Sequence, residues 1–220
     1  MVRGRSLRCV LPDCAAALTT SGPATPGAAA KAALRERIRA DRSVEPLARG
    51  AARGVRLATF STALSERSES GLAGFQPTNR EPDVLALLRA VHIPVFLPRV
   101  TGVTLEWVRA QPDDLAARER RGIPRPTGPA IARGAEIARL VDVLLVPALA
   151  IDPTTGARLG YGSGFYDRLI ADLPASVLTV GVCRDKDLQP VPVEVHDRAV
   201  AAVLTESGLR PVGAATVDTP

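Results

Sequence analysis

Three glycines at alternate positions, followed by an aromatic pair and an acid, form the segment of the sequence best suited to chemistry. They are Gly160, Gly162 and Gly164 in "RLGYGSGFYDR", residues 158–168. Such a loop loses much conformational entropy on folding, so we expect a geometric or a chemical reason for it. Either the glycines only permit a tight turn, or their successive N–H groups form a concave nest for an anion. The loop alone leaves both interpretations open.

Positive charge surrounds this loop. Arg158 and Arg168 flank it, and a helix expected to begin near Phe165 would direct its positive N-terminal end toward the same place. The segment is not a P-loop, because no Gly-Lys-Ser/Thr follows, and its spacing differs from the Gly-x-Gly-x-x-Gly dinucleotide fingerprint. These features favour a phosphate-binding loop of another kind.

Asp167 stands at the far edge of the loop, where a phosphate would repel its carboxylate. A divalent cation between the two removes that repulsion, so we expect Mg²⁺ to be held by this carboxylate and by phosphate oxygens. The alternative is an ordinary acid in the first turn of a helix, where it complements the helix dipole.

Two further segments carry candidate residues. In "PVEVHDRAV", residues 192–200, Asp197 is either a second metal carboxylate or a turn acid, and His196 is either a base or a structural histidine. Lys31 and Arg35, one helical turn apart, either clamp a triphosphate or lie on a solvated helix face.

The chain pattern indicates an α/β protein with a mostly parallel sheet, because helical and strand-like segments alternate. The segment 142–152 is apolar without alternation, which is typical of a strand buried on both faces. In such sheets ligands bind at the carboxyl ends of the strands, and the glycine loop follows one of those ends. We expect helices over 31–43, most of 44–64, 82–92, 136–141 and 164–173, strands over 72–77, 93–100, 103–108, 142–152, 176–183 and 198–205, and a long connection over 109–134.

Length and composition limit the class of protein. The 220 residues allow one sizeable core, and the net charge of +5 is spread along the chain rather than gathered in a basic block. We therefore expect small phosphate-bearing partners and no nucleic acid. No apolar run has the length of a membrane span. Three cysteines and two histidines without finger-like spacing argue against a zinc site and fit free thiols in a reducing cytoplasm.

The first thirty residues differ in composition from the rest. They have a basic start and then an Ala-, Pro- and Gly-rich stretch, which resembles an export signal only weakly because Pro12 and Asp13 interrupt it. We expect residues 1–30 to be a disordered or weakly packed extension, 31–210 to be a single α/β domain, and 211–220 to be a tail.

Several stretches together resemble one family. "VDVLLVPALAIDPTTGARLGYGSGFYDR" is similar to the signature of the 5-formyltetrahydrofolate cyclo-ligases (methenyltetrahydrofolate synthetases). "KAALRERIRADRS", "FQPTNREPDVLALL" and "LQPVPVEVHDRAVAAVLTESG" fit other parts of that family in the same order, so the match covers roughly residues 31 to 209.

The resemblance implies a three-layer, Rossmann-like sandwich and an ATP- and Mg²⁺-dependent closure of 5-formyltetrahydrofolate to 5,10-methenyltetrahydrofolate, with release of ADP and phosphate. It implies a cytoplasmic enzyme that is a monomer or a weak homo-oligomer. Arg158 and Tyr166 would be catalytic, Asp167 and Asp197 would bind the metal, and Glu81 and Gln76 would contact the folate. The ATP-binding residues would be Lys31, Arg35, Arg158, Leu159, Gly160, Tyr161, Gly162, Ser163, Gly164, Phe165 and Tyr166.

Some positions depart from the family pattern. Ser163 stands where the family often has glycine, Phe165 replaces the first of two tyrosines, and Arg125 stands where related sequences commonly have an acid. Two other interpretations stay open: a relative that binds nucleotide without catalysis, and a sugar-phosphate enzyme on a similar sheet. The first has little need for Glu81, and the second does not explain the pair Lys31 and Arg35.

Overall fold

The computed structural model describes residues 25–44, 47–78, 81–116 and 125–213. Its helices are α1 (Pro26–Ser43), α2 (Leu47–Ala58), α3 (Ser61–Ser65), α4 (Leu85–Ala90) and α5 (Phe165–Asp172), with 3-10 turns η1 (Pro112–Leu115), η2 (Gly134–Arg139) and η3 (Asp185–Asp187). Its strands are β1 (Leu72–Ala73), β2 (Val95–Thr101), β3 (Thr104–Arg109), β4 (Ala130–Arg133), β5 (Val143–Pro147), β6 (Ala150–Ile151), β7 (Arg158–Leu159), β8 (Leu178–Val182), β9 (Ala202–Thr205) and β10 (Gly208–Pro211).

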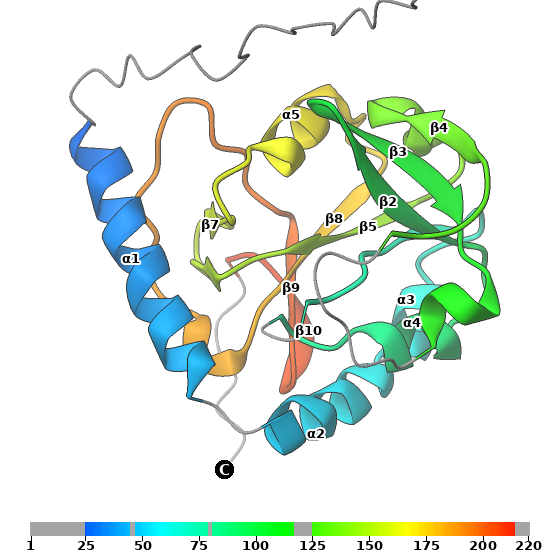
Figure 1. The fold of residues 1–220 in the computed structure, drawn as a ribbon, viewed down its shortest axis with the longest axis horizontal. Coiled ribbons are helices and arrows are strands. Elements are labelled where there is room, and N and C mark those ends of the chain that lie inside the picture. Colours follow the sequence, from blue (N-terminus) through cyan, green and yellow to red (C-terminus); the bar gives the residue numbers. More distant parts are fainter. Residues whose placement is uncertain (1–24, 45–46, 79–80, 117–124, 214–220) are drawn as a thin grey trace, which may run out of the picture.

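An eight-stranded sheet with the order β10-β9-β8-β5-β1-β2-β3-β4 lies at the centre of the described residues (Figure 1). The five inner strands β9, β8, β5, β1 and β2 pair in parallel, and β10, β3 and β4 add antiparallel edges. The predicted α/β class with a mostly parallel sheet is therefore confirmed.

Helices cover both faces of this sheet, which gives three layers. On one face, Leu57 of α2, Leu64 of α3 and Leu87 of α4 share an apolar cluster with sheet residues. On the other face, Leu169 of α5 and Ile137 of η2 pack in a second cluster. β5 is fully buried between the two faces, as its apolar sequence without alternation predicts.

Helix α1 lies outside this sandwich and packs against the small antiparallel pair of β6 and β7 (Figure 1). Its Ile38 belongs to a third apolar cluster with Leu149, Leu159 and Val191. The Thr25 hydroxyl caps the helix by accepting the N–H of Ala28, and Pro26 occupies the first turn. The helix thus begins five residues before the expected boundary at residue 31.

Several expected elements differ in the structure. The expected strand 142–152 is two strands in different sheets, because the chain leaves the central sheet after Pro147 to pair with β7. The expected strand 72–77 is shortened to β1, and residues 74–77 form no ladder with a neighbouring strand. The expected connection 109–134 contains the edge strand β4, whose exposed positions give no apolar pattern. The short helix expected over 136–141 is the 3-10 turn η2.

Within the described ranges, none of the helices combines the length and the apolar character needed to cross a lipid bilayer. The expectations for residues 1–24 and 214–220 fall outside the described residues.

Candidate active site

A cavity of about 630 Å³ opens at the carboxyl ends of the central parallel strands. Phe75 and Gln76, which come after β1, and Pro147, which ends β5, line it. The direction in which successive strands are added to the sheet reverses between β1 and β5. The chain passes from β1 to β2 on one side, whereas β5 lies on the other side of β1. Ligands of open α/β sheets bind at such a switch point, so the fold itself indicates this cavity as the site.

Nearly every predicted site residue lines this cavity. They are Lys31, Arg35, Gln76, Glu81, Arg158, Gly160, Tyr161, Gly162, Ser163, Gly164, Phe165, Tyr166, Asp167 and Asp197. Leu159 does not line it. Its side chain packs in the cluster beneath α1, and its carbonyl accepts the N–H of Leu149. Only its backbone is therefore near the loop.

The three glycines of the loop have different reasons to be glycine. Gly162 and Gly164 have φ values of 108° and 67°, which side chains rarely adopt, so the turn itself requires them. Gly160 has no positive φ, and a Cβ added there would meet no atom of the described residues within 4 Å. Gly160 lines the cavity, so the space that its missing side chain leaves open is space for a ligand.

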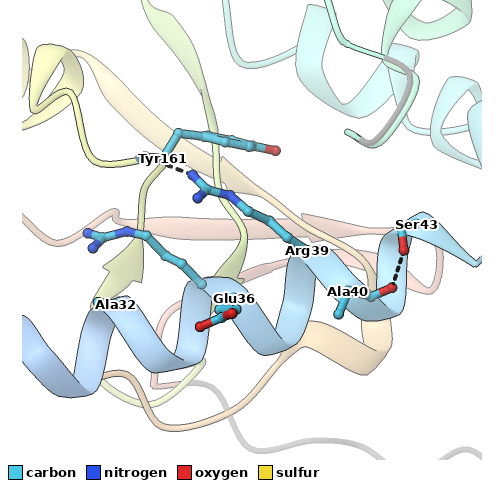
Figure 2. Close-up of a pocket in the computed structure, with 7 residues that line it drawn as sticks. Ala32, Glu36, Arg39, Ala40, Ser43 and Tyr161 are labelled. Atoms are coloured by element: carbon cyan, nitrogen blue, oxygen red, sulfur yellow. Dashed lines mark hydrogen bonds between the residues drawn. The ribbon is translucent and has the colours of Figure 1, made fainter.

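Arginines of α1 hold this loop by its carbonyl oxygens. Arg35 Nε donates to the oxygen of Gly160 at 2.9 Å, and Arg39 Nη2 donates to that of Tyr161 at 3.1 Å. Figure 2 shows Arg39 extending from α1 toward the Tyr161 backbone. Both residues line an open groove of about 820 Å³. Arg42 Nη1 donates to the Tyr161 hydroxyl at 3.1 Å. Helix α1 therefore fixes the loop from one side.

The backbone N–H groups of residues 160–164 donate hydrogen bonds to no residue that the structure describes. Because N–H and C=O of a trans peptide point in opposite directions, the N–H groups of Tyr161 and Gly162 point away from the arginines that hold the preceding carbonyls. Helix α5 then begins at Phe165, and its first-turn amides come directly after the loop. This arrangement favours an anion nest over a simple turn.

Arg158 and Asp167 form an ion pair at the edge of the loop. Arg158 Nη2 lies 2.8 Å from Asp167 Oδ1, and Nη1 donates to the carbonyl of Arg198. The Arg158 residue is 5% exposed, and burial lowers its pKa while the charge of Asp167 opposes that shift. The sequence predicts Arg158 as a positive charge beside the loop, and the structure adds that Asp167 is its ion-pair partner. Arg168 is exposed, and its Nη2 donates to the carbonyl of Ser163.

Lys31 is an almost fully buried charged residue of the cavity wall, at 3% exposure. Its ammonium pairs with Glu194 Oε2 at 3.0 Å and with Asp197 Oδ2. The hydrogen bonds from Lys31 and from the Thr25 hydroxyl lower the pKa of Glu194. Burial alone would raise the pKa of Asp197, but hydrogen bonds from Lys31 and from the Glu194 N–H lower it. Both acids are therefore carboxylates at neutral pH.

Each of the two predicted metal carboxylates keeps one oxygen available. Asp167 Oδ1 accepts from Arg158 and from the Arg198 N–H, and Asp197 Oδ2 accepts from Lys31 and from the Glu194 N–H. The second oxygens, Asp167 Oδ2 and Asp197 Oδ1, accept no hydrogen bond within the described ranges. The same ranges contain no cluster of three or more metal-ligating side chains. Two carboxylates completed by phosphate oxygens are the donor set that Mg²⁺ prefers, so the residues fit this ion.

The other end of the cavity is apolar. Phe75, Pro98, Val100 and Leu105 line it, and they come from the end of β1 and from β2 and β3. Such a wall suits a flat, largely apolar ring system.

Polar side chains also line the cavity. Glu81 accepts the N–H of Thr78 at 2.6 Å, and its charge adds to burial in raising the pKa of both Tyr161 and Tyr166. Tyr166 thus stays protonated and can donate a hydrogen bond but cannot act as a base. Gln76 donates to the carbonyl of Asp114 at 2.9 Å, while its buried Oε1 has no hydrogen-bond partner among the residues that the structure describes. A donor on a ligand would satisfy that oxygen.

Some residues of the site were missed or misjudged from the sequence. Glu194 was not predicted, although it is an acid three residues before Asp197 and in the same segment. His196 was expected as a base or as a structural histidine. Its side chain is 72% exposed at the rim, and its Nε2 lies 3.9 Å from Asp197 Oδ1. Arg125 also lines the cavity, and its Nη2 donates to the carbonyl of Val100 at 3.5 Å.

The model of the 5-formyltetrahydrofolate cyclo-ligase family matches residues 28–206. A 5-formyltetrahydrofolate cyclo-ligase of Mycolicibacterium smegmatis is 38% identical over 144 residues, which are 61% of this chain and 72% of that protein. A protein of the same name from Saccharomyces cerevisiae is 35% identical over 79 residues, or 33% of this chain and 37% of that protein.

Solved structures with a similar fold carry a related name. The 5,10-methenyltetrahydrofolate synthetase of Aquifex aeolicus aligns with a TM-score of 0.66 and 24% identity, over 86% of this chain and 96% of that one. The Mycoplasma pneumoniae synthetase aligns with a TM-score of 0.58 and 17% identity, over 79% and 96%. At these identities the likeness concerns the fold.

Proposed function

The chain belongs to the 5-formyltetrahydrofolate cyclo-ligase family, and from that premise we propose that it closes 5-formyltetrahydrofolate to 5,10-methenyltetrahydrofolate with consumption of ATP. The observation that carries the proposal is a run of N–H groups at residues 160–164 that donate to no described residue, at one end of a cavity whose other end is apolar. A triphosphate fits the first end and the folate ring system fits the second. One cavity therefore holds both substrates next to each other.

The chemistry needs activation of a poor electrophile. The formyl group is bonded to a ring nitrogen and is stabilised by resonance. In the first step the bond between the terminal phosphorus and the ADP oxygen breaks, and a bond from that phosphorus to the formyl oxygen forms. In the second step a neighbouring nitrogen of the same folate attacks the formyl carbon, and the carbon–oxygen bond breaks. Phosphate leaves with the oxygen and carries the proton of the attacking nitrogen.

In this proposal the protein positions the reactants and balances charge, and it supplies no nucleophile. The N–H groups of the loop hold phosphate oxygens in the nest, Arg35 of α1 supports the loop from its carbonyl side, and both Arg35 and Lys31 bring positive charge to the same cavity. Arg158 keeps Asp167 oriented through their 2.8 Å ion pair, and its own charge faces the same end of the cavity. Asp167 Oδ2 and Asp197 Oδ1 would hold Mg²⁺, which when bound neutralises charge on the phosphate oxygens.

The folate end would recognise the substrate by shape and by a few polar contacts. We assign Glu81 and Gln76 to folate recognition, since each brings an acceptor to the cavity: a carboxylate, and an amide oxygen without a partner among the described residues. The protonated hydroxyl of Tyr166 would donate a hydrogen bond near the reacting groups. A neutral donor at this place helps the formyl oxygen to carry developing charge.

The test is direct formation of product. Purified protein is incubated with 5-formyltetrahydrofolate, ATP and Mg²⁺, and methenyltetrahydrofolate is followed by its absorbance, with ADP measured in parallel. We expect one ADP for each methenyl product and no product without ATP. Nucleotide binding without product would reject the proposal in favour of a relative that only binds nucleotide.

The location and assembly of the protein stay predictions. We propose a cytoplasmic enzyme that acts as a monomer or weak homo-oligomer on small-molecule substrates. Light scattering of the purified chain at several concentrations tests the second statement.

A further inference from the structure

Glu194 links three parts of the site that lie far apart in sequence. Its Oε2 accepts from the Lys31 ammonium at 3.0 Å, and its Oε1 accepts from the Thr25 hydroxyl at 2.9 Å. Its backbone N–H donates to Asp197 Oδ2 at 2.6 Å. The first turn of α1 packs closely on it, because a Cβ added at Gly27 would lie 3.2 Å from Glu194 Cγ. The position of this carboxylate is thus fixed from several sides.

Lys31 is shared between two acids with different tasks. Asp197 is one of the two carboxylates that would hold Mg²⁺, whereas Glu194 faces Lys31 and the start of α1. A carboxylate that binds a divalent cation attracts an ammonium less strongly, because part of its charge is already balanced. Metal binding at Asp197 therefore leaves Glu194 as the principal acid that holds Lys31.

An ammonium has three N–H donors. Two of those of Lys31 are directed at Glu194 and Asp197, so one is left for a ligand in the cavity. A lysine held by Glu194 keeps its charge next to the nest when Asp197 serves the metal. Without the Glu194 charge, Lys31 would pair with Asp197 alone and would compete with the metal for it.

We propose that Glu194 is a positioning residue, which keeps the Lys31 ammonium at the phosphate end of the cavity and so leaves Asp197 available to Mg²⁺. This inference rests on the proposed function, because it takes the nucleotide and its metal as the ligands of this end. Glu194 acts through Lys31 and Asp197 and touches neither reacting group.

The test variant is Glu194→Gln, which keeps the shape and a hydrogen-bond acceptor but removes the charge. Binding of the non-hydrolysable analogue AMP-PNP is measured by calorimetry at a series of Mg²⁺ concentrations. We expect the Mg²⁺ concentration for half-maximal affinity to rise about tenfold, the size expected for loss of one charge-assisted hydrogen bond. Affinity for AMP-PNP without metal should change much less.

Two control variants distinguish the positioning role of Glu194 from an effect of net charge and from an effect of the helix cap. Glu36→Gln removes an exposed acid from the same helix, away from Lys31, and reports the effect of net charge. Thr25→Val removes the other side-chain contact of Glu194 and loosens the helix cap. Both should stay within about twofold of wild type, as expected for exposed groups.

The inference is overturned if Glu194→Gln matches wild type in its Mg²⁺ dependence, or if the net-charge control Glu36→Gln reproduces the loss. Failure of the proposed function is seen separately, since wild-type protein would then bind AMP-PNP with Mg²⁺ but form no methenyltetrahydrofolate.

Discussion

Replacing Gly160 with alanine should separate ligand binding from folding. Gly160 has no positive φ, and its added methyl group would meet no atom of the described residues within 4 Å, so alanine can adopt the native backbone. A compatible Gly→Ala change restricts the unfolded chain and stabilises a protein by about 0.4–1 kcal/mol. For a domain of this size that corresponds to a rise in Tm of roughly 1–4 °C.

The same methyl group would stand in the nest. If a phosphate approaches the backbone there, alanine forces it outward, and crowding of a packed contact costs about 1–3 kcal/mol. That loss corresponds to a nucleotide affinity that is weaker by roughly 5- to 150-fold. We therefore expect a protein that is slightly more stable than wild type and binds Mg²⁺ and AMP-PNP poorly.

Two glycines serve as controls for Gly160. Gly162, with φ 108°, should lose both stability and binding on change to alanine, because strained backbone costs about 1–3 kcal/mol. Gly208 also has open space around it and lies away from the cavity, so its alanine variant should leave binding unchanged. Thermal unfolding and calorimetric titration measure both quantities on each variant. Normal nucleotide affinity in Gly160→Ala would refute phosphate binding by the loop N–H groups. A loss of stability as large as that of Gly162→Ala would show that the native backbone at position 160 has no room for a Cβ.

Three other variants test separate parts of the site and the fold. Asp167→Asn should abolish the Mg²⁺ dependence of nucleotide binding in calorimetry, and should also lower the free energy of unfolding by about 1–2 kcal/mol because buried Arg158 loses its charged partner; full retention of metal dependence would contradict the metal role. Glu81→Gln should raise the KM for 5-formyltetrahydrofolate about tenfold and leave that for ATP unchanged, as steady-state kinetics would show, and equal effects on both would place Glu81 elsewhere. Asp142, whose pKa is lowered chiefly by the N–H groups of the loop before β1, stabilises the fold above its unfolded pKa and loses this effect as pH falls through the lower folded value. Asp142→Asn should therefore cost about 1 kcal/mol near pH 7 in urea unfolding and progressively less below about pH 3.8, and a constant difference would count against this account.

The phosphate end of the site was the part that could best be predicted from the sequence. A dense glycine pattern next to a buried strand and a helix start is a local signal, and the structure places α5 and the cavity where that signal indicates. The mostly parallel sheet could also be predicted from a local signal, because buried parallel strands appear in the sequence as continuous apolar runs.

The parts that were missed depend on contacts between distant segments. The edge strand β4 and the two-residue strand β7 are too short to show a period. Arg39 and Arg42 look like a solvated helix face until the loop that they hold is placed beside them. Glu194 gives no signal of its own, because its role comes from a lysine more than a hundred and fifty residues earlier. Such pairings are properties of the tertiary structure.

The position of α1 outside the sandwich has a consequence for the dynamics of this protein. Apart from Ile38 and its small cluster, the helix is joined to the rest mainly by polar bonds: to the loop, to Glu194 and, at its C-terminal end, from buried Arg42 to Asp187. Elements with few apolar contacts open before the core does. Amide hydrogens of α1 should thus exchange with deuterium sooner than those of β5 and β8. Because the nucleotide would bridge helix and loop, its binding should slow exchange in α1 and leave the inner strands as they were.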